Sequence, residues 1–263
     1  MTQIRPGIEW AGLSDIGCQR KDNEDRYSYW EPADEETFRR KGRLAIVADG
    51  MGGYEGGQEA SRIALETIEQ VYGETPNGDP RALLLSGFQT AHQRILAYAA
   101  EHPLLRGMGT TCTAVALLGD GLYYAHVGDS RLYLWRNSKI YRLTRDHSYV
   151  GRLVEQGIIG PQEAASHPQR NILIMALGAS PEIAPESPEQ PISLEKGDVL
   201  LLCTDGLWTL VSDSEMQASL AANQLDEACQ DLVKKAKARG GPDNITLQAL
   251  RIAELPSNGA EPA

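Results

Sequence analysis

Residues 44–53 read LAIVADGMGG, an apolar run followed by an aspartate and a cluster of glycines. The run Leu44–Ala48 is short and bounded by turn residues, which is typical of a buried strand. The glycines after Asp49 let the backbone pass close to a ligand, and the Gly50 carbonyl could itself bind a metal. An apolar run that ends in an aspartate and a small residue recurs at Val127–Ser130 and at Cys203–Gly206.

Four aspartates adjoin predicted strands, and they are Asp49, Asp129, Asp205 and Asp243. Asp-Gly is a common turn dipeptide, so each aspartate taken alone is compatible with an ordinary turn. Packed together, the four carboxylates would repel and raise one another's pKa values, so a cation should offset them. Oxygen ligands without a His/Cys cluster favour Mg²⁺ or Mn²⁺ over zinc.

A charged run near the start of the chain places a basic pair beside three acids. It extends from Arg20 to Asp25 and includes Glu24. A solvated turn would account for such a run, and the sequence leaves that interpretation open. An arginine is, however, the residue that can hold two phosphate oxygens in a bidentate fork beside a metal site.

The composition fits one domain with one substantial core. The chain has 263 residues, 41% of them hydrophobic, which is ordinary for a single large domain. The net charge of −11, from 25 basic and 36 acidic residues, argues against a nucleic-acid partner. The apolar runs are far shorter than the roughly 20 residues of a membrane helix.

We expect a cytoplasmic monomer that does not bind membranes. The stretch Met1–Trp10 lacks the apolar region of a signal peptide. The cysteines have no C-x-x-C spacing, so we expect buried reduced thiols rather than a disulfide framework or a zinc site. The four cysteines are Cys18, Cys112, Cys203 and Cys229.

Strands and helices follow from the apolar patterns. Seven runs predict strands, and these are Ile8–Leu13, Leu44–Ala48, Thr111–Leu118, Leu122–Val127, Arg131–Trp135, Val199–Cys203 and Ile245–Ile252. Turn signals at Gly119–Gly121 and Asn137–Ser138 predict hairpins and an antiparallel meander in the middle of the chain. Three segments have helical periodicity, and these are Gln58–Tyr72, Pro80–Ala100 and Asp226–Ala238. Strands grouped apart from helices predict an α+β fold.

Residues 1–253 are predicted to form a single domain. A polar stretch over about residues 144–180 predicts a flap, with short helical pieces at Tyr149–Gln156 and Pro161–Ser166. Residues 254–263 mix Pro, Gly, Ser and Glu with little apolar content, which predicts a disordered tail.

Taken together, these motifs resemble the metal-dependent protein phosphatases of type 2C, the PPM family, in their compact bacterial form. Each motif is weak alone, but six in the family's order, from about Glu9 to Ile252, are highly specific. The matching segments are Arg20–Asp25, Val47–Gly53, Gly109–Thr111, His126–Arg131, Leu202–Leu207 and Gly240–Thr246. The resemblance implies an α+β fold with a central β-sandwich of two antiparallel sheets flanked by helix pairs. It also implies a metal site at one end of the sandwich, with the flap beside it.

The resemblance further implies a set of metal ligands. Asp49 would bridge two Mn²⁺ or Mg²⁺ ions, and Gly50 would offer its carbonyl to one of them. Asp205 and Asp243 would complete the site of the other ion. Asp129 would help Asp205 to hold a third, looser ion.

The remaining motif residues are implied to act around these ions. Asp25 and Glu24 would act through bound waters, and Arg20 would bind the substrate phosphate. A water activated between two metals would hydrolyse phosphoserine and phosphothreonine in proteins without a covalent phosphoenzyme. Phosphorylated proteins, with a bacterial Ser/Thr protein kinase and its substrates among them, are the partners that the resemblance implies.

One position departs from the family pattern. Many members have a histidine just after the glycine cluster, proposed to protonate the leaving alkoxide, where this chain has Tyr54. A phenol with a pKa of about 10 can still donate a proton to an alkoxide, although Tyr54 could equally be a packing residue. His147, at the start of the flap, is a second candidate donor with an ordinary surface or capping role as its alternative. Our hypothesis is that a metal-bound water supplies this proton.

Two other classes of function fit parts of the pattern. A pseudophosphatase would bind phosphoproteins without hydrolysis, but it usually lacks a metal carboxylate, and all four aspartates are present here. An enzyme with an aspartyl nucleophile would need a second acid two residues after Asp49, where this chain has Met51. We therefore expect a metal-dependent protein Ser/Thr phosphatase.

Overall fold

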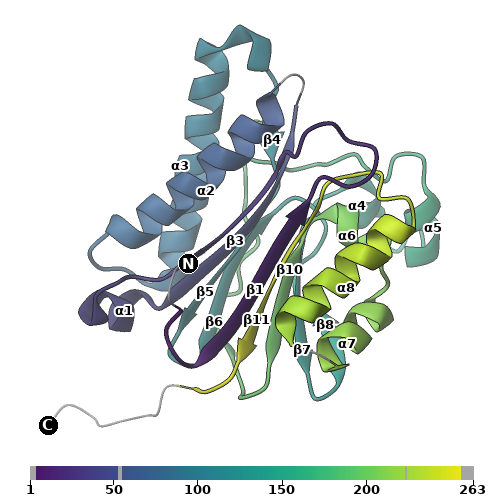
Figure 1. Cartoon of the computed structure of the whole chain (residues 1–263). Helices are drawn as coiled ribbons and strands as arrows, with labels where there is room; N and C mark the ends of the chain where they lie inside the picture. The colour runs from purple at the N-terminus through teal and green to yellow at the C-terminus, as the bar shows by residue number, and fades with distance from the viewer. Residues whose placement is uncertain (1–3, 53–54, 223, 256–263) are drawn as a thin grey trace, which may run out of the picture.

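We analysed a computed structural model of the chain, which describes residues 4–52, 55–222 and 224–255. In these ranges the strands form two antiparallel sheets (Figure 1). The five-stranded sheet has the order β1 (Ile8–Asp15), β11 (Ile245–Ile252), β10 (Val199–Cys203), β7 (Arg131–Arg136) and β8 (Lys139–Arg142). The six-stranded sheet has the order β2 (Asp25–Trp30), β3 (Arg43–Met51), β5 (Cys112–Leu118), β6 (Gly121–Val127) and β9 (Ile192–Ser193), with β4 (Gly109–Thr110) paired to β3.

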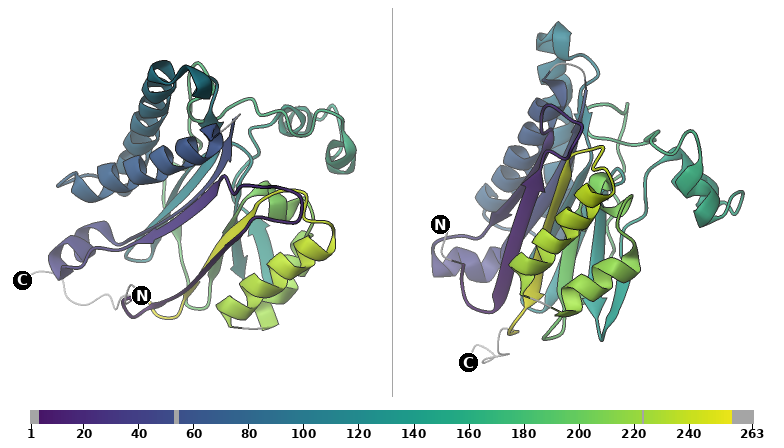
Figure 2. Two further views of the ribbon diagram at one scale, coloured as in Figure 1. Left: turned by 45° about the horizontal axis from the view of Figure 1, so that its top comes forward. Right: turned by 45° about the vertical axis from the view of Figure 1, so that its right-hand side comes forward.

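Helix pairs cover the outer faces of both sheets (Figures 1 and 2). Helices α2 (Gly56–Glu74) and α3 (Pro80–Glu101) pack on the six-stranded sheet, and α7 (Asp213–Ala222) and α8 (Leu225–Ala238) pack on the five-stranded sheet. The shorter helices are α1 (Glu35–Lys41), η1 (Pro103–Leu105), α4 (Tyr149–Glu155), α5 (Pro161–Ser166) and α6 (Asp205–Trp208). The predicted sandwich flanked by helix pairs is confirmed.

Side chains of the central strands alternate between two apolar layers. In β3, Leu44 and Ile46 pack under α2 and α3, whereas Ala45 and Val47 face the opposite sheet. Successive side chains of a strand point to opposite faces, so a continuous apolar run fits a strand that is buried on both sides. This explains why LAIVA lies at the centre of the sandwich.

A polar side chain joins the two sheets inside this core. Gln248, on β11, is fully buried, and its Nε2 donates hydrogen bonds to the Ile46 carbonyl at 2.7 Å and to the Ser28 carbonyl at 3.3 Å. Its Oε1 accepts a hydrogen bond from Trp10 Nε1 at 3.0 Å. Because Ile46 and Ser28 belong to the six-stranded sheet, Gln248 fixes the position of one sheet against the other.

The predicted meander is wrong at one point. β5 and β6 form a hairpin, and so do β7 and β8, whose turn residues Asn137 and Ser138 have φ values of 51° and 59°. Between the hairpins, however, the chain crosses from the six-stranded sheet to the five-stranded sheet. The crossing occurs at Gly128–Ser130, which is one of the aspartate motifs.

The segment predicted as a flap leaves the sandwich on one side, where α4 and α5 lie apart from the sheets (Figure 2). One antiparallel bridge, Ser148 with Leu173, joins the two ends of this segment to each other, and a second, Leu177 with Thr110 of β4, attaches it to the sandwich. The short helices predicted here are present, at Tyr149–Glu155 and Pro161–Ser166. Of the predicted tail, residues 256–263 lie outside the described residues.

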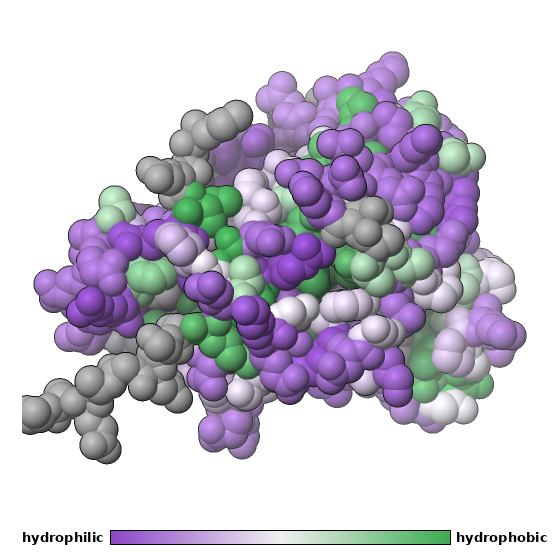
Figure 3. All heavy atoms as spheres, turned by 60° about the horizontal axis from the view of Figure 1, so that its bottom comes forward, coloured by the Kyte–Doolittle hydropathy of each residue, from purple (hydrophilic) through white to green (hydrophobic). Residues whose placement is uncertain are grey.

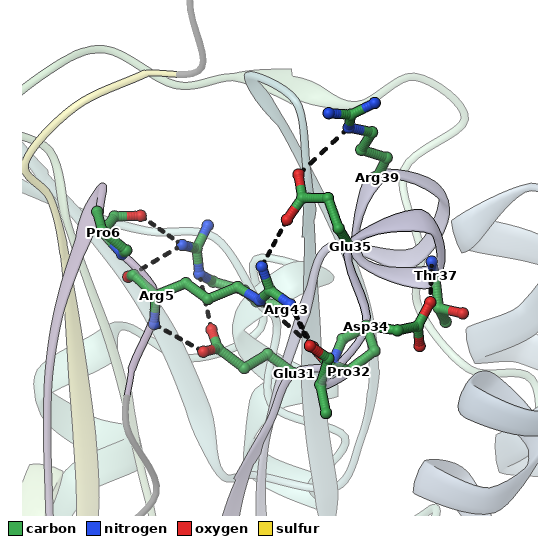
Figure 4. A network of polar contacts seen from close by, with 10 residues as sticks. Arg5, Pro6, Glu31, Pro32, Asp34, Glu35, Thr37, Arg39 and Arg43 are labelled. Carbon is green, nitrogen blue, oxygen red and sulfur yellow. Dashed lines mark hydrogen bonds and ion pairs between the residues drawn. The ribbon is translucent and has the colours of Figure 1, made fainter.

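An ion network closes the end of β2 and β3 that lies opposite to their aspartates (Figure 4). Arg5 contacts Glu35 at 2.6 Å and donates hydrogen bonds to the carbonyls of Pro32 and Ala33. Its guanidinium lies 4.5 Å from the ring centroid of Phe38. Beside it, Arg43 pairs with the buried Glu31 carboxylate at 3.2 Å. The network anchors the start of the described chain against α1.

The face turned forward in Figure 3 is largely hydrophilic, and its hydrophobic residues lie in small separate areas. Within the described ranges, no helix combines the length and the apolar character needed to cross a membrane. The cysteines, all within those ranges, are free of disulfides; Cys112, Cys203 and Cys229 are buried as predicted, whereas Cys18 is exposed.

Candidate metal centre

Asp49 and Asp25 lie opposite each other at neighbouring ends of β3 and β2. The Asp49 amide donates a hydrogen bond to Thr111 Oγ1 at 3.2 Å, and its carbonyl accepts one from Thr110 Oγ1 at 2.9 Å. The buried Asp25 carboxylate accepts a hydrogen bond from Thr204 Oγ1 at 2.8 Å. Because Thr204 follows β10, this bond joins the two sheets at the end where the aspartates lie.

Asp205 and Asp243 reach the same end from the five-stranded sheet. Asp205 is the first residue of α6, two residues after the end of β10, and its carboxyl lies close enough to that of Asp49 for their charges to interact. Asp243 lies two residues before β11. The Thr204 amide donates a hydrogen bond to the Thr246 carbonyl at 2.9 Å, so the end of β10 and the start of β11 are adjacent. The two sheets therefore contribute aspartates to one site.

Asp129 comes from the turn between β6 and β7, where only 8% of the residue is exposed. Trp208, in α6, donates a hydrogen bond from Nε1 to the Asp129 carbonyl at 2.9 Å. Beneath the turn, Thr111 Oγ1 and Ser130 Oγ are 2.7 Å apart. Thr111 thus contacts the backbone of Asp49 and the residue after Asp129, which ties these two aspartate segments together.

Glycines bring α2 and the β2–β3 ends into close approach. The Gly50 amide donates a hydrogen bond to the Glu24 carbonyl at 3.2 Å. A Cβ at Gly50 would collide with the Gly57 carbonyl, and a Cβ at Gly57 would lie 2.5 Å from Glu24 Oε1. No side chain fits between these backbones, which explains the glycines on both sides.

Asn244 is a structural residue of the site whose role the sequence did not predict. Its Oδ1 accepts a hydrogen bond from the Glu24 amide at 2.9 Å, and its Nδ2 donates to the carbonyls of Ile16 and Asp22, each at 3.0 Å. These bonds hold the loop that carries Arg20 and Glu24 against the start of β11. In the sequence, the one hint of this role is that Asn244 directly follows the candidate ligand Asp243.

Burial and mutual repulsion raise the pKa values of four aspartates of the site, Asp25, Asp49, Asp129 and Asp205. Burial is the larger cause for Asp25, whose pKa rises to about 7, and for Asp205, whose pKa rises to about 6. The pKa of Asp49 rises well above its usual value, because of burial and then of Asp25 and Asp205. Burial likewise raises the pKa of Asp129, with a further contribution from Asp205. Burial also raises that of Glu24.

The donor set fits hard divalent cations. The side chains that converge on the site offer carboxylate oxygens, and Gly50 offers a carbonyl, which are ligands that Mg²⁺ and Mn²⁺ prefer. The nearby arginines are already paired, since Arg20 contacts Asp243 at 2.7 Å and Arg131 contacts Asp146 at 2.7 Å. Buried carboxylates that raise one another's pKa are stabilised in their charged form when cations bind between them.

The structure places the other predicted site residues as follows. Arg20 is half-exposed beside the aspartates, and its guanidinium contacts Asp243. His147 is partly buried, and its Nδ1 accepts a hydrogen bond from the Gly128 amide at 3.2 Å. Its ring centroid lies 4.9 Å from that of His126. Tyr54 lies outside the described residues. The role of proton donor therefore stays a prediction for both candidates.

Comparison with known proteins identifies the family. A family model described as protein phosphatase 2C matches residues 22–237. The chain belongs to this family. It is 34% identical over 262 residues to the serine/threonine protein phosphatase PstP of Mycobacterium tuberculosis, and the match covers 100% of this chain and 48% of PstP. It is 34% identical to the protein phosphatase PhpP of Streptococcus pneumoniae, over 94% of this chain and 98% of PhpP.

A solved structure of a relative has the same fold as this chain. The crystal structure of the PstP catalytic domain in complex with two manganese ions has a TM-score of 0.81, at 33% sequence identity. The match covers 94% of this chain and 99% of that one. The present chain thus spans about half the length of the full M. tuberculosis protein and matches nearly all of the PstP catalytic-domain structure.

Proposed function

We propose that this chain is a metal-dependent protein phosphatase that hydrolyses phosphoserine and phosphothreonine with Mn²⁺ or Mg²⁺. The observation that carries the proposal is the group of aspartates, contributed by both sheets, whose charges oppose one another in the absence of a cation. Family membership and the manganese-bound PstP structure support the same conclusion. We assign Asp49, Asp205, Asp243 and the Gly50 carbonyl to two ions, and Asp129 with Asp205 to a looser third.

The bound metals would supply Lewis-acid activation of a water molecule for attack on phosphorus. This chain's residues would keep the site in place for that reaction. Thr204 holds Asp25 by a hydrogen bond, and Asn244 holds the backbone of Glu24. We assign Asp25 and Glu24 to waters around the ions, because each adjoins a proposed ligand through the backbone, Asp25 opposite Asp49 and Glu24 bonded to Gly50.

Arg20 is the residue that we assign to the substrate phosphate. Its guanidinium lies next to Asp243 and is half-exposed, so an incoming phosphate could reach it. A guanidinium binds two phosphate oxygens and stabilises the charge that develops on them during transfer. A cation held by Asp243 would weaken the attraction of this carboxylate for Arg20 and would leave the guanidinium available to the phosphate.

The partners follow from the reaction. A phosphatase of this specificity removes groups that Ser/Thr protein kinases add, so we propose that phosphorylated proteins, and a kinase with its substrates, are the partners. We also propose that the chain acts as a monomer. Free thiols are typical of reducing compartments and support a cytoplasmic location.

The test is hydrolysis of p-nitrophenyl phosphate and of a phosphothreonine peptide, with Mn²⁺ and with EDTA. We expect activity only with the metal. Asp205→Asn should lower kcat/KM by about two to three orders of magnitude, the scale found when one group that stabilises transition-state charge is removed. Asp22→Asn makes the same charge change on an exposed neighbouring side chain and should have little effect. Activity that survives both EDTA and Asp205→Asn would refute the proposal.

A further inference from the structure

A cluster of three titratable side chains lies at the base of the flap, outside the aspartate site. The nearest ligand-type atoms of His126, His147 and Glu186 all lie within 4.8 Å of one another. His126 is fully buried on β6, three residues before Asp129. His147 and Glu186 lie on segments that enter and leave the flap region. A set of two histidines and a glutamate first suggests a metal site.

Hydrogen bonds already occupy the groups that a cation would need. His126 Nε2 lies 3.1 Å from the Arg145 carbonyl, which can only accept, so this nitrogen carries the proton. Burial lowers the pKa of His126 to about 3, so the ring is neutral and its Nδ1 accepts from Thr113 Oγ1 at 2.8 Å. Glu186 Oε2 accepts from the Arg145 amide at 2.9 Å. We therefore assign this cluster to structure and not to a cation.

His147 holds the turn that carries Asp129 by two hydrogen bonds. Its amide donates to the Gly128 carbonyl at 2.7 Å, and its Nδ1 accepts from the Gly128 amide at 3.2 Å. Gly128 has a φ of +108°, and a Cβ there would lie 2.5 Å from Thr111 Cβ. The backbone of residue 128 is thus confined by Thr111 on one side and bound to His147 by both of its polar groups.

The residues next to His147 hold the same turn on its other side. Asp146 pairs with Arg131 at 2.7 Å, and the Arg131 guanidinium lies 3.4 Å from the ring centroid of Trp208. Trp208 in turn donates its indole hydrogen to the Asp129 carbonyl. The start of the flap therefore contacts the chain at positions 126, 128 and 131, on both sides of Asp129.

We propose that His147 is a positioning residue, which holds the Gly128–Asp129 turn and thereby couples the base of the flap to the affinity of the Asp129 metal position. This inference rests on the proposed function, in which Asp129 is a metal ligand. In this inference, His147 acts by holding the backbone of Gly128 and not by transferring a proton. Partners of this kind commonly change metal affinity by about 10- to 100-fold when they are lost.

Two variants of His147 separate this role from simple packing. The amide oxygen of Asn stands on the same carbon as Nδ1 of His, so His147→Asn can still accept from Gly128. In His147→Gln the amide lies one bond further out, near the place of Nε2, and the acceptor for Gly128 is lost. Asp129→Asn gives the reference for a damaged metal position, and the double variant Asp129→Asn/His147→Gln tests whether the two effects share one cause.

The measurements are equilibrium Mn²⁺ binding by electron paramagnetic resonance and the Mn²⁺ concentration for half-maximal activity. We expect His147→Gln to raise both the dissociation constant of the weakest Mn²⁺ and the half-maximal concentration about tenfold, and His147→Asn to stay close to wild type. In the Asp129→Asn background, His147→Gln should add little. Thermal melting checks that each variant folds; if His147→Gln does not, His147→Ser, which is too short to reach Gly128, replaces it.

Three results would overturn the inference. The first is wild-type Mn²⁺ binding in His147→Gln, and the second is equal loss in the Asn and Gln variants, which indicates packing alone. The third is full additivity with Asp129→Asn. In each case an active wild type that requires Mn²⁺, together with an impaired Asp129→Asn, leaves the proposed function intact. A wild type that neither binds Mn²⁺ nor hydrolyses phosphoesters refutes both.

Discussion

As a proposed metal ligand, Asp49 would be unfavourable for the metal-free fold and useful for the metal-bound one. It follows a buried strand and faces Asp25 across the ladder, so burial and a neighbouring carboxylate both oppose its charge. An aspartate selected for stability alone would not occupy this position. Divalent cations bound at the proposed site would remove the penalty, because they would bring positive charge next to the buried carboxylates.

The raised pKa values predict that the stability of the metal-free protein depends on pH. A carboxyl with a higher pKa in the folded chain binds protons more tightly there, so its stabilisation is present below the unfolded pKa and is lost as pH rises through the folded pKa. The folded values are about 7 for Asp25 and about 6 for Asp205. We expect the melting temperature in EDTA to fall between about pH 5 and about pH 8.

Added Mn²⁺ should reverse this loss, so the increase in melting temperature on adding Mn²⁺ should be larger near pH 8 than near pH 5. Differential scanning fluorimetry at both pH values measures it. Asp25→Asn should weaken the pH dependence in EDTA, whereas Asp22→Asn, on an exposed side chain, should preserve it. An Mn²⁺ effect of equal size at both pH values would contradict the assignment of these carboxyls to the metal site.

At the scale of elements, the contact between α6 and β11 brings Asp205 and Asp243 together. Gly206 is the second residue of α6, and a Cβ there would collide with the Asn244 carbonyl. We expect Gly206→Ala to lower the free energy of unfolding by about 1–3 kcal/mol, as overpacking usually does, and to weaken Mn²⁺ binding, because the two aspartates must separate.

Urea denaturation and Mn²⁺ titration measure both effects. Gly160→Ala is the matched control, since Gly160 has a φ of −82° and a Cβ added there would meet no atom within 4 Å. It should change the free energy of unfolding by less than about 0.5 kcal/mol. Equal behaviour of the two variants would show that the α6–β11 contact does not position the aspartates.

The elements that the sequence predicted are those with a strong local pattern. β10, β11 and α5 have the predicted bounds, because apolar runs and a Pro at the helix start mark them. β2 was missed, since its sequence DRYSYW is polar and aromatic and lies at a sheet edge. α1 was missed because it is short and depends on the Asp34 cap and on the distant Arg5.

The site could be predicted only in part for a similar reason. The aspartates were visible as repeated strand-end motifs, and the family order gave them roles. The groups that hold them were not visible, because their contacts join distant positions. Thr204 and Asp25 are 179 residues apart, and Asn244 and Glu24 are 220 apart. No local pattern records such contacts.

At the scale of the whole molecule, we expect the Arg5 network to contribute to stability without contributing to the proposed metal site. The Arg5 network closes the end of β2 and β3 away from the aspartates (Figure 4). We expect Arg5→Ala to lower the free energy of unfolding by about 2 kcal/mol, through its carbonyl hydrogen bonds and its contact with Phe38. The Mn²⁺ requirement and kcat/KM should stay unchanged.

Arg39→Ala provides the comparison, because Arg39 pairs with the same Glu35 but its side chain is 78% exposed. Removal of such a surface pair should cost less than about 1 kcal/mol. Chemical denaturation, together with phosphatase assays at a fixed Mn²⁺ concentration, distinguishes the two variants. A loss of activity in Arg5→Ala that exceeds its loss of folded protein would show that the two ends are coupled.

The hydrogen bonds of Gln248 help to keep the two sheets in the alignment that the proposed metal centre requires. The proposed ligands come from both sheets, so metal–oxygen distances, which tolerate only about 0.2 Å of error, depend on how accurately one sheet is aligned with the other. A sheet that slid along its partner by one residue would move its aspartates by about 3.3 Å. Gln248 opposes that motion from the middle of the core. Loosening of the interface between the sheets would therefore abolish metal binding while each sheet was still intact.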